Sequence, residues 1–224
     1  MIKRFRDRRD AGRRLAKELH SYANRSDVIV LALPRGGLPV GFEIAMALGA
    51  PLDVFVVRKL GLPWHEELAM GALASGGVRV LDDDLIRVAR VSDEDIRRVT
   101  AAEQAELERR ERQYRGDRPF PKLAGKTVVL VDDGLATGST MRAAVAALRK
   151  ERPARIVVAV PVAAPETCES FRSIVDEIVC AETPEPFQAV GLWYEDFSQT
   201  TDDEVHQLLE RAGNWRETAS ATRS

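Results

Sequence analysis

The chain has 224 residues, of which 45% are hydrophobic and 30% are charged, and its net charge is −2. This length and composition predict a globular chain with a substantial buried core, organised as one domain. The small net charge argues against general nucleic-acid binding. The first 25 residues are basic, with nine Lys or Arg and three acids, but a solvated helix face explains them at least as well as a phosphate-binding arm.

Targeting and redox signals are sparse. No apolar run approaches the roughly 18 residues of a membrane span, and the N-terminus does not have the pattern of a signal peptide. We therefore expect a cytoplasmic protein. Cys168 and Cys180 lack metal-ligand spacing and are too few for a disulfide framework, so they are predicted to be buried, reduced thiols.

In chain order, apolar strands alternate with helices. Strands are predicted over residues 28–33, 51–57, 128–131, 156–160 and 174–180, and helices over 10–22, 37–48, 139–150 and 165–171. This alternation predicts an α/β fold, a parallel sheet with helices on both faces. Ligands of such sheets bind beyond the carboxyl ends of the strands.

The alternation breaks between residues 58 and 126. A hairpin is predicted over 68–81 around Ser75-Gly76-Gly77, a long charged helix over 92–113 that begins with the capping pair Ser92 and Asp95, and a linker over 116–121. We interpret residues 60–121 as an inserted lid, although a structural arm or a dimer contact would explain the long helix equally well.

The rest of the chain belongs to the same predicted domain, 1–224. Near the C-terminus, Thr201 and Glu204 form a capping box that begins a last helix. The polar segment 214–224 is predicted to be a frayed tail.

The most informative segment is 128–141, Val-Val-Leu-Val-Asp-Asp-Gly-Leu-Ala-Thr-Gly-Ser-Thr-Met. A buried strand ends in Asp132 and Asp133, and a small, hydroxyl-rich turn then begins a helix. Backbone N–H groups, hydroxyls and the positive end of the helix dipole together make an anion site. Because carboxylates repel phosphate, the two acids should contact another part of the same ligand, either sugar hydroxyls or a divalent metal. The segment has neither the spacing nor the lysine of a Walker P-loop, and the chain lacks a Rossmann fingerprint.

This segment resembles the motif with which type I phosphoribosyltransferases bind 5-phosphoribosyl 1-pyrophosphate (PRPP). The resemblance implies that Asp132 and Asp133 hold the ribose 2- and 3-hydroxyls. It also implies Mg²⁺, bridging pyrophosphate and ribose oxygens. The 5-phosphate would be wrapped by the turn residues, Ala136, Thr137, Gly138, Ser139 and Thr140. An ordinary strand, turn and helix with a polar cap is the alternative.

Two further segments could bind pyrophosphate. Arg35 and Gly36 lie in a glycine-rich turn after the first strand, and the family's corresponding short loop grips pyrophosphate. Arg58 and Lys59 end the next predicted strand, as in orotate-type enzymes, although the further lysine of those enzymes is missing. Each segment has a simpler explanation, as a surface turn and as a solvated strand end.

The acceptor is less defined. Trp193, Tyr194 and Phe197 could stack on a base or pack the last helix onto the sheet. His65, in a predicted loop with Glu66 and Glu67, could handle the proton of the base or be simply solvated. Hypoxanthine and guanine enzymes commonly carry an aspartate where this chain has Ala136, which disfavours a 6-oxopurine.

These observations predict a phosphoribosyltransferase that transfers the phosphoribosyl group of PRPP to a nitrogenous base, with Mg²⁺ as cofactor and pyrophosphate as product. The expected partners are PRPP, an unidentified base and a second copy of the chain in a homodimer. The alternative is a regulator that senses PRPP or a nucleotide without catalysis. Arg58 and Lys59 favour turnover, since a pair of cations would neutralise the leaving pyrophosphate.

Overall fold

The protein is described by a computed structural model that covers residues 4–221. Its main sheet has five parallel strands in the order β2–β1–β6–β7–β8. The strands are β1 (Val28–Ala32), β2 (Leu52–Val54), β6 (Thr127–Val131), β7 (Arg155–Val162) and β8 (Glu177–Glu182). The predicted parallel α/β fold is therefore confirmed.

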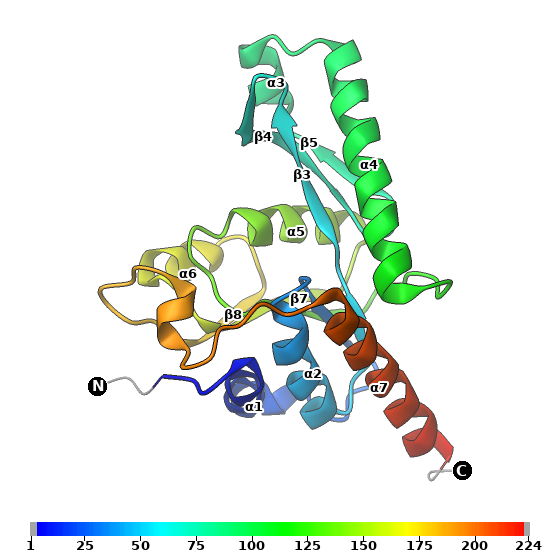
Figure 1. Ribbon diagram of the computed structural model, residues 1–224, viewed down its shortest axis with the longest axis vertical. Coiled ribbons are helices and arrows are strands. Elements are labelled where there is room, and N and C mark those ends of the chain that lie inside the picture. Colours follow the sequence, from blue (N-terminus) through cyan, green and yellow to red (C-terminus); the bar gives the residue numbers. More distant parts are fainter. Residues whose placement is uncertain (1–3, 222–224) are drawn as a thin grey trace.

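Helices cover both faces of this sheet (Figure 1). On β1, Val28 and Val30 pack toward one face and Ile29 and Leu31 toward the other, because successive side chains of a strand alternate. The first face is covered by α1 (Arg8–Glu18), α2 (Gly37–Leu48) and α7 (Asp202–Ala221), and the second by α5 (Ser139–Lys150) and α6 (Pro165–Phe171). Burial on both faces explains why these strands are continuous apolar runs.

The strand order places a ligand site between β1 and β6. From β1 the chain passes through α2 to β2 at one edge, whereas from β6 it passes through α5 to β7 on the other side. The two neighbouring strands are thus the topological switch point, from which the following loops diverge and beside which ligands of such sheets bind. The loops after β1 and β6 carry the two glycine-containing segments identified in the sequence.

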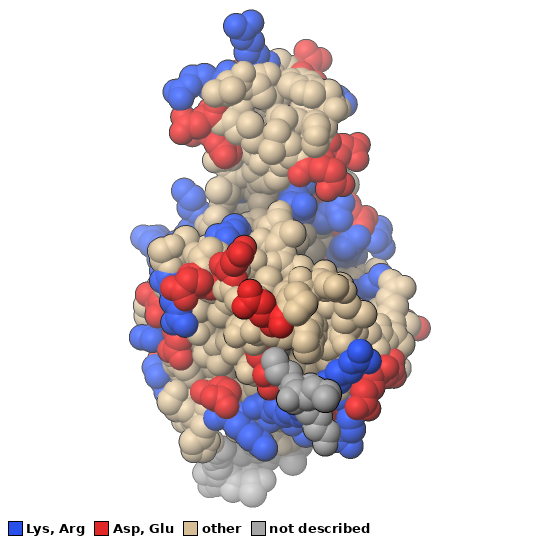
Figure 2. All heavy atoms as spheres, turned by 90° about the vertical axis from the view of Figure 1, so that its left-hand side faces the viewer, with Lys and Arg blue, Asp and Glu red and all other residues tan. Residues whose placement is uncertain are grey.

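A second sheet stands above the first. The antiparallel strands β3 (Val57–Leu62), β4 (His65–Ala74) and β5 (Val78–Leu81), with α3 (Asp83–Ala89) and α4 (Asp93–Arg115), form a projection that we call the hood, residues 57–115 (Figure 1). The hairpin turn at Ser75-Gly76-Gly77 and the Ser92 cap of α4 are confirmed. In Figure 2 the hood is a separate lobe, and on the face drawn there Lys and Arg alternate with Asp and Glu rather than gathering in one basic patch.

The C-terminal end of α4 anchors the hood to the core. Arg115 has a side chain only 4% exposed; its Nε donates to Asp53 Oδ1 at 3.1 Å and its Nη2 to the Val54 carbonyl at 3.1 Å. Tyr114 donates its hydroxyl to Asp202 at the start of α7, at 2.7 Å. The base of the hood is therefore fixed. The interpretation of residues 60–121 as a lid stays a prediction.

Several predicted boundaries are wrong. The strand expected over 51–57 is two strands, because the chain leaves the parallel sheet after Val54 and enters the hood at Val57. The last strand begins at Glu177 rather than at residue 174, and α3 was not predicted. The first helix ends at Glu18 and is followed by a 3₁₀ turn, His20–Tyr22.

The C-terminal helix is longer than expected. The cap of α7 is confirmed, with Glu204 N donating to Thr201 Oγ1 at 3.1 Å. The helix extends to Ala221, so the frayed tail predicted over 214–224 is helical up to that residue, and 222–224 lie outside the described residues. Within residues 4–221, no helix is both long and apolar enough to cross a membrane.

Candidate functional site

The loops after β1 and β6 are in direct contact at the switch point. Leu33 N donates to the Val131 carbonyl at 2.9 Å. A β-carbon on Gly37 would lie 2.8 Å from that same carbonyl oxygen, and one on Gly36 would lie 2.0 Å from Asp133 Oδ2. Both distances are too short for a real side chain. The glycines are thus needed to bring the predicted pyrophosphate loop against the acid pair.

The two acids are held close together at the end of β6. Asp133 N donates to Asp132 Oδ1 at 2.9 Å. Burial, and then the neighbouring Asp133 carboxylate, raise the pKa of Asp132 well above its ordinary value. Burial also raises the pKa of Asp133, against an opposing effect of the Arg8 guanidinium. Such perturbed carboxylates at the carboxyl edge of a parallel sheet are typical of a functional site.

The turn after the acids has the geometry of an anion site. Gly138 has φ +74°, in the left-handed region, and is the N-cap of α5. Thr137, Ser139 and Thr140 lie around it, and the first N–H groups of α5 lack acceptors within the helix. Thr137 and Ser139 line a cleft of about 950 Å³ whose opposite wall belongs to the hood. A phosphate bound at this turn would lie beneath the hood.

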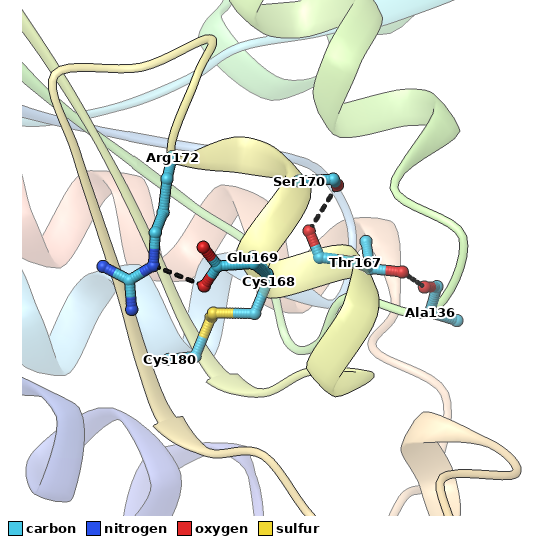
Figure 3. Close-up of a disulfide and its surroundings, with 7 residues drawn as sticks. All are labelled: Ala136, Thr167, Cys168, Glu169, Ser170, Arg172 and Cys180. Carbon is cyan, nitrogen blue, oxygen red and sulfur yellow. Dashed lines mark hydrogen bonds and ion pairs between the residues drawn. A yellow bond between two sulfur atoms is a disulfide. The ribbon is translucent and has the colours of Figure 1, made fainter.

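Helix α6 supports this turn from behind (Figure 3). Thr167 Oγ1 donates to the Ala136 carbonyl at 2.6 Å. A β-carbon on Gly138 would lie 2.7 Å from the ring of Phe171, which also packs under Arg142. The position of α6 therefore fixes the backbone of the predicted phosphate loop.

The same helix carries one half of a disulfide. Cys168 on α6 is bonded to Cys180 on β8 (Figure 3). The prediction of two reduced thiols is thus wrong for this structure. Since β8 pairs beside β7 and α6 follows β7 directly, the fold brings the two Cα atoms to 6.8 Å despite the uninformative spacing.

Arg35 lies directly before Gly36 in the loop after β1. Its side chain is 37% exposed, and its Nη1 is 4.0 Å from Asp202 Oδ1 at the start of α7. A depression here is lined by Arg35, Gln199 and Thr201, among others. Arg35 is therefore accessible from solvent next to Gly36, and its contact with pyrophosphate stays a prediction.

Arg58 and Lys59 do not line this depression. Both lie within β3 of the hood rather than at the end of a core strand, and they line a separate cleft between β3 and α4. Arg58 Nε pairs with Glu103 on α4 at 2.6 Å. The predicted position was wrong because the chain leaves the parallel sheet before these residues.

The aromatic segment has mainly a packing role. Tyr194 is 3% exposed, lies between Phe5 and Phe197 with ring centroids 5.5 and 5.0 Å away, and donates its hydroxyl to the Asp133 carbonyl at 2.5 Å. Burial raises the pKa of Tyr194. Phe197 carries the Arg8 guanidinium on one ring face. Tyr194 thus has no free face for a base, while stacking by the half-buried Trp193 stays a prediction.

His65 and Arg8 have surroundings that differ from those predicted from the sequence. His65 is exposed at the first position of β4, rather than in a loop. Arg8, at the start of α1, belongs to the stretch interpreted as a solvated basic face, yet its Nε donates to Asp133 Oδ2 at 2.8 Å. Nothing in the spacing of the basic N-terminal residues separates Arg8 from its neighbours.

Fold and site together define a class. A parallel α/β sheet with an acid pair and an anion-binding helix N-terminus at its switch point is suited to a ligand that carries both phosphate and hydroxyl groups. The model of the phosphoribosyl transferase domain family matches residues 1–195, and the chain belongs to that family.

Individual relatives agree with this assignment. Two proteins of Mycobacterium tuberculosis, from strains CDC 1551 / Oshkosh and ATCC 25618 / H37Rv, are provisionally named phosphoribosyl transferases and are each 46% identical over 211 residues, 94% of this chain. The chain spans about half of their length, 47%. The crystal structure of TT1426 from Thermus thermophilus is 44% identical, with a TM-score of 0.83 over 93% of this chain and 98% of that one.

Proposed function

We propose that this chain transfers the 5-phosphoribosyl group of PRPP to a nitrogenous base and releases pyrophosphate, with Mg²⁺. The observation that carries the proposal is the contact between the two loops at the switch point. Gly36 lies against Asp133, and the phosphate turn around Gly138 follows in the same loop. The two touching loops would therefore supply a pyrophosphate grip, a diol clamp and a 5-phosphate cradle.

The residues have distinct roles in the reaction. Breaking the C1–O bond of PRPP develops positive charge on the ribose ring and negative charge on the leaving pyrophosphate. The turn around Gly138 holds the 5-phosphate, and Asp132 and Asp133 accept hydrogen bonds from the ribose hydroxyls. Arg35 and the Gly36 backbone bind the leaving group. Such a reaction depends on positioning and charge, and no protein nucleophile is required.

The acid pair fits Mg²⁺. Among residues 4–221, no group of three or more His, Cys, Asp or Glu could hold a metal by itself. Mg²⁺ is commonly bound by one or two carboxylates together with the oxygens of a phosphorylated substrate. Asp132 or Asp133 would supply the protein oxygen. When bound, the ion would neutralise charge on the pyrophosphate.

The acceptor is constrained but not identified. Ala136 stands where hypoxanthine and guanine enzymes commonly have an acid, and its carbonyl is occupied by Thr167. Ala136 therefore offers no proton acceptor to a 6-oxopurine. We propose a base whose proton is not taken by this loop.

The test is a panel of bases incubated with PRPP and Mg²⁺ while pyrophosphate release is followed. Release with one base, lost in Asp133→Asn and retained in the exposed control Asp117→Asn, would support the enzyme. PRPP binding without release from any base would favour the sensing regulator. Absence of PRPP binding by the wild-type protein would refute both.

A further inference from the structure

Arg8 makes three contacts that hold its side chain in one conformation. Its Nε donates to Asp133 Oδ2 at 2.8 Å and its Nη1 to the Ser198 carbonyl at 2.7 Å. Its guanidinium carbon lies 3.9 Å from the centre of the Phe197 ring. Only 12% of the side chain is exposed. A planar guanidinium suits this combination of two hydrogen bonds and a stacked ring, which an ammonium group could not reproduce.

The Arg8 contact completes the restraint of Asp133. The backbone of Asp133 is fixed on both sides, by its N–H donating to Asp132 and by its carbonyl accepting from the Tyr194 hydroxyl. The carboxylate itself can still rotate about its side-chain bonds. The bond from Arg8 holds the oxygen Oδ2, which lies against Gly36. Arg8 thus determines which way the carboxylate turns.

The backbone that carries Arg8 is itself held at the site. The N-terminal segment pairs with the aromatic segment: Phe5 N donates to the Trp193 carbonyl at 2.9 Å, and Glu195 N donates to the Phe5 carbonyl at 2.8 Å. Asp7 caps α1 by accepting from Asp10 N at 2.7 Å. Arg8 therefore projects from a fixed helix start rather than from a free strand.

We infer that Arg8 is a positioning residue for the ribose clamp: by holding Oδ2 of Asp133 it leaves the other carboxylate oxygen turned toward the ribose hydroxyl. This inference rests on the proposed function, because it assumes that Asp133 binds the ribose. It adds a residue from outside both motifs. Arg8 does not touch the substrate and acts through Asp133.

The inference predicts a selective loss of affinity. Ribose 5-phosphate needs the diol clamp, whereas pyrophosphate does not. In Arg8→Gln the charged hydrogen bond is lost and the Asp133 carboxylate can rotate, so the dissociation constant for ribose 5-phosphate should rise roughly tenfold. Affinity for pyrophosphate should be unchanged. Arg8→Lys keeps the positive charge but not the planar, forked guanidinium, and it should give an intermediate loss of affinity for ribose 5-phosphate.

The experiment is calorimetric titration of the full chain with each ligand. The matched control is Arg9→Gln, since Arg9 lies on the same helix and pairs instead with Glu43 at 3.8 Å. In an Asp133→Asn background, Arg8→Gln should cause no further loss of affinity for ribose 5-phosphate. This double-mutant cycle isolates an effect that passes through Asp133.

Equal ribose 5-phosphate binding by wild type and Arg8→Gln would overturn the inference. Equal weakening of ribose 5-phosphate and pyrophosphate would also overturn it, since that indicates a merely structural role. If Arg8→Gln does not fold, Arg8→Lys carries the same comparison. Failure of the wild-type protein to bind ribose 5-phosphate or PRPP would instead refute the proposed function, so the two failures are distinguishable.

Discussion

The replacement Gly36→Ala tests the contact on which the site depends. Gly36 has φ −60° and ψ −33°, a conformation that alanine adopts freely, so the substitution introduces no backbone strain. Its only effect on the folded state is steric. The new β-carbon would lie 2.0 Å from Asp133 Oδ2 and 2.7 Å from Asp133 Cγ, where ordinary contact begins at 3.4 Å.

The required movement sets the magnitude. The loop or the carboxylate must shift by roughly 1 Å, and a misplacement of about 1 Å at a reacting group can cost about a hundredfold in rate. We therefore expect kcat/KM for PRPP to fall about a hundredfold. Crowding of this kind also lowers the free energy of unfolding by about 1–3 kcal/mol. The protein should stay folded while its site is displaced.

The assay is pyrophosphate release under single-turnover conditions, with calorimetric PRPP binding and thermal unfolding measured on the same samples. Gly213→Ala is the control. Gly213 is also a helical glycine, but a β-carbon there would have Arg118 Nη1 as its nearest neighbour, at 4.0 Å. It should leave PRPP binding unchanged. PRPP affinity and turnover within twofold of wild type in Gly36→Ala would refute the reasoning, because the loops could then not be in contact.

Three further predictions follow from the support of the site. Burial raises the folded-state pKa of Asp132 above its unfolded value of about 3.9, so ionisation of this carboxyl destabilises the folded state as pH rises. Asp132→Asn should therefore have a higher Tm than wild type at pH 8. This gain in Tm should disappear below about pH 4, where the wild-type carboxyl is protonated in both states. Thr167→Val removes a hydrogen bond worth about 1 kcal/mol from the phosphate loop and should weaken phosphate binding roughly fivefold in calorimetry, unlike Ser173→Ala. Reduction of the Cys168–Cys180 bond, which closes a short loop, should lower the free energy of unfolding by about 3 kcal/mol in urea titrations, and an unchanged midpoint would contradict the bond.

Local signals in the sequence were sufficient for the core of the fold. The continuous apolar run of β6 and the two acids directly after it predict a strand that ends in an acid pair. The structure shows both the strand and the adjoining acid pair. The hood entry at Val57 could not be predicted in the same way. The apolar run from Val54 to Val57 has no break in pattern, because hydrophobicity records burial and not which sheet a strand joins. Arg58 and Lys59 were misplaced for that reason.

The parts of the site that sequence reading missed are contacts between distant residues. Arg8 is 125 positions from Asp133, and its charge is indistinguishable from those of Arg9 and Arg13 until the fold selects the residue that faces inward. The cysteine pair is similar, since only the neighbouring positions of α6 and β8 bring the sulfurs together.

These long-range contacts have a common consequence for how the acid pair is stabilised. Two adjacent half-buried carboxylates repel each other, and the motif of residues 128–141 contains no cation to offset that repulsion. The compensating charge comes from Arg8, which is held by a segment paired with residues 193–196. The motif therefore supplies the acid pair but not the cation that stabilises it. A fragment that kept the motif and lost either pairing segment would retain the acids without their counter-charge, and the Asp133 carboxylate would lose the hydrogen bond that fixes its orientation.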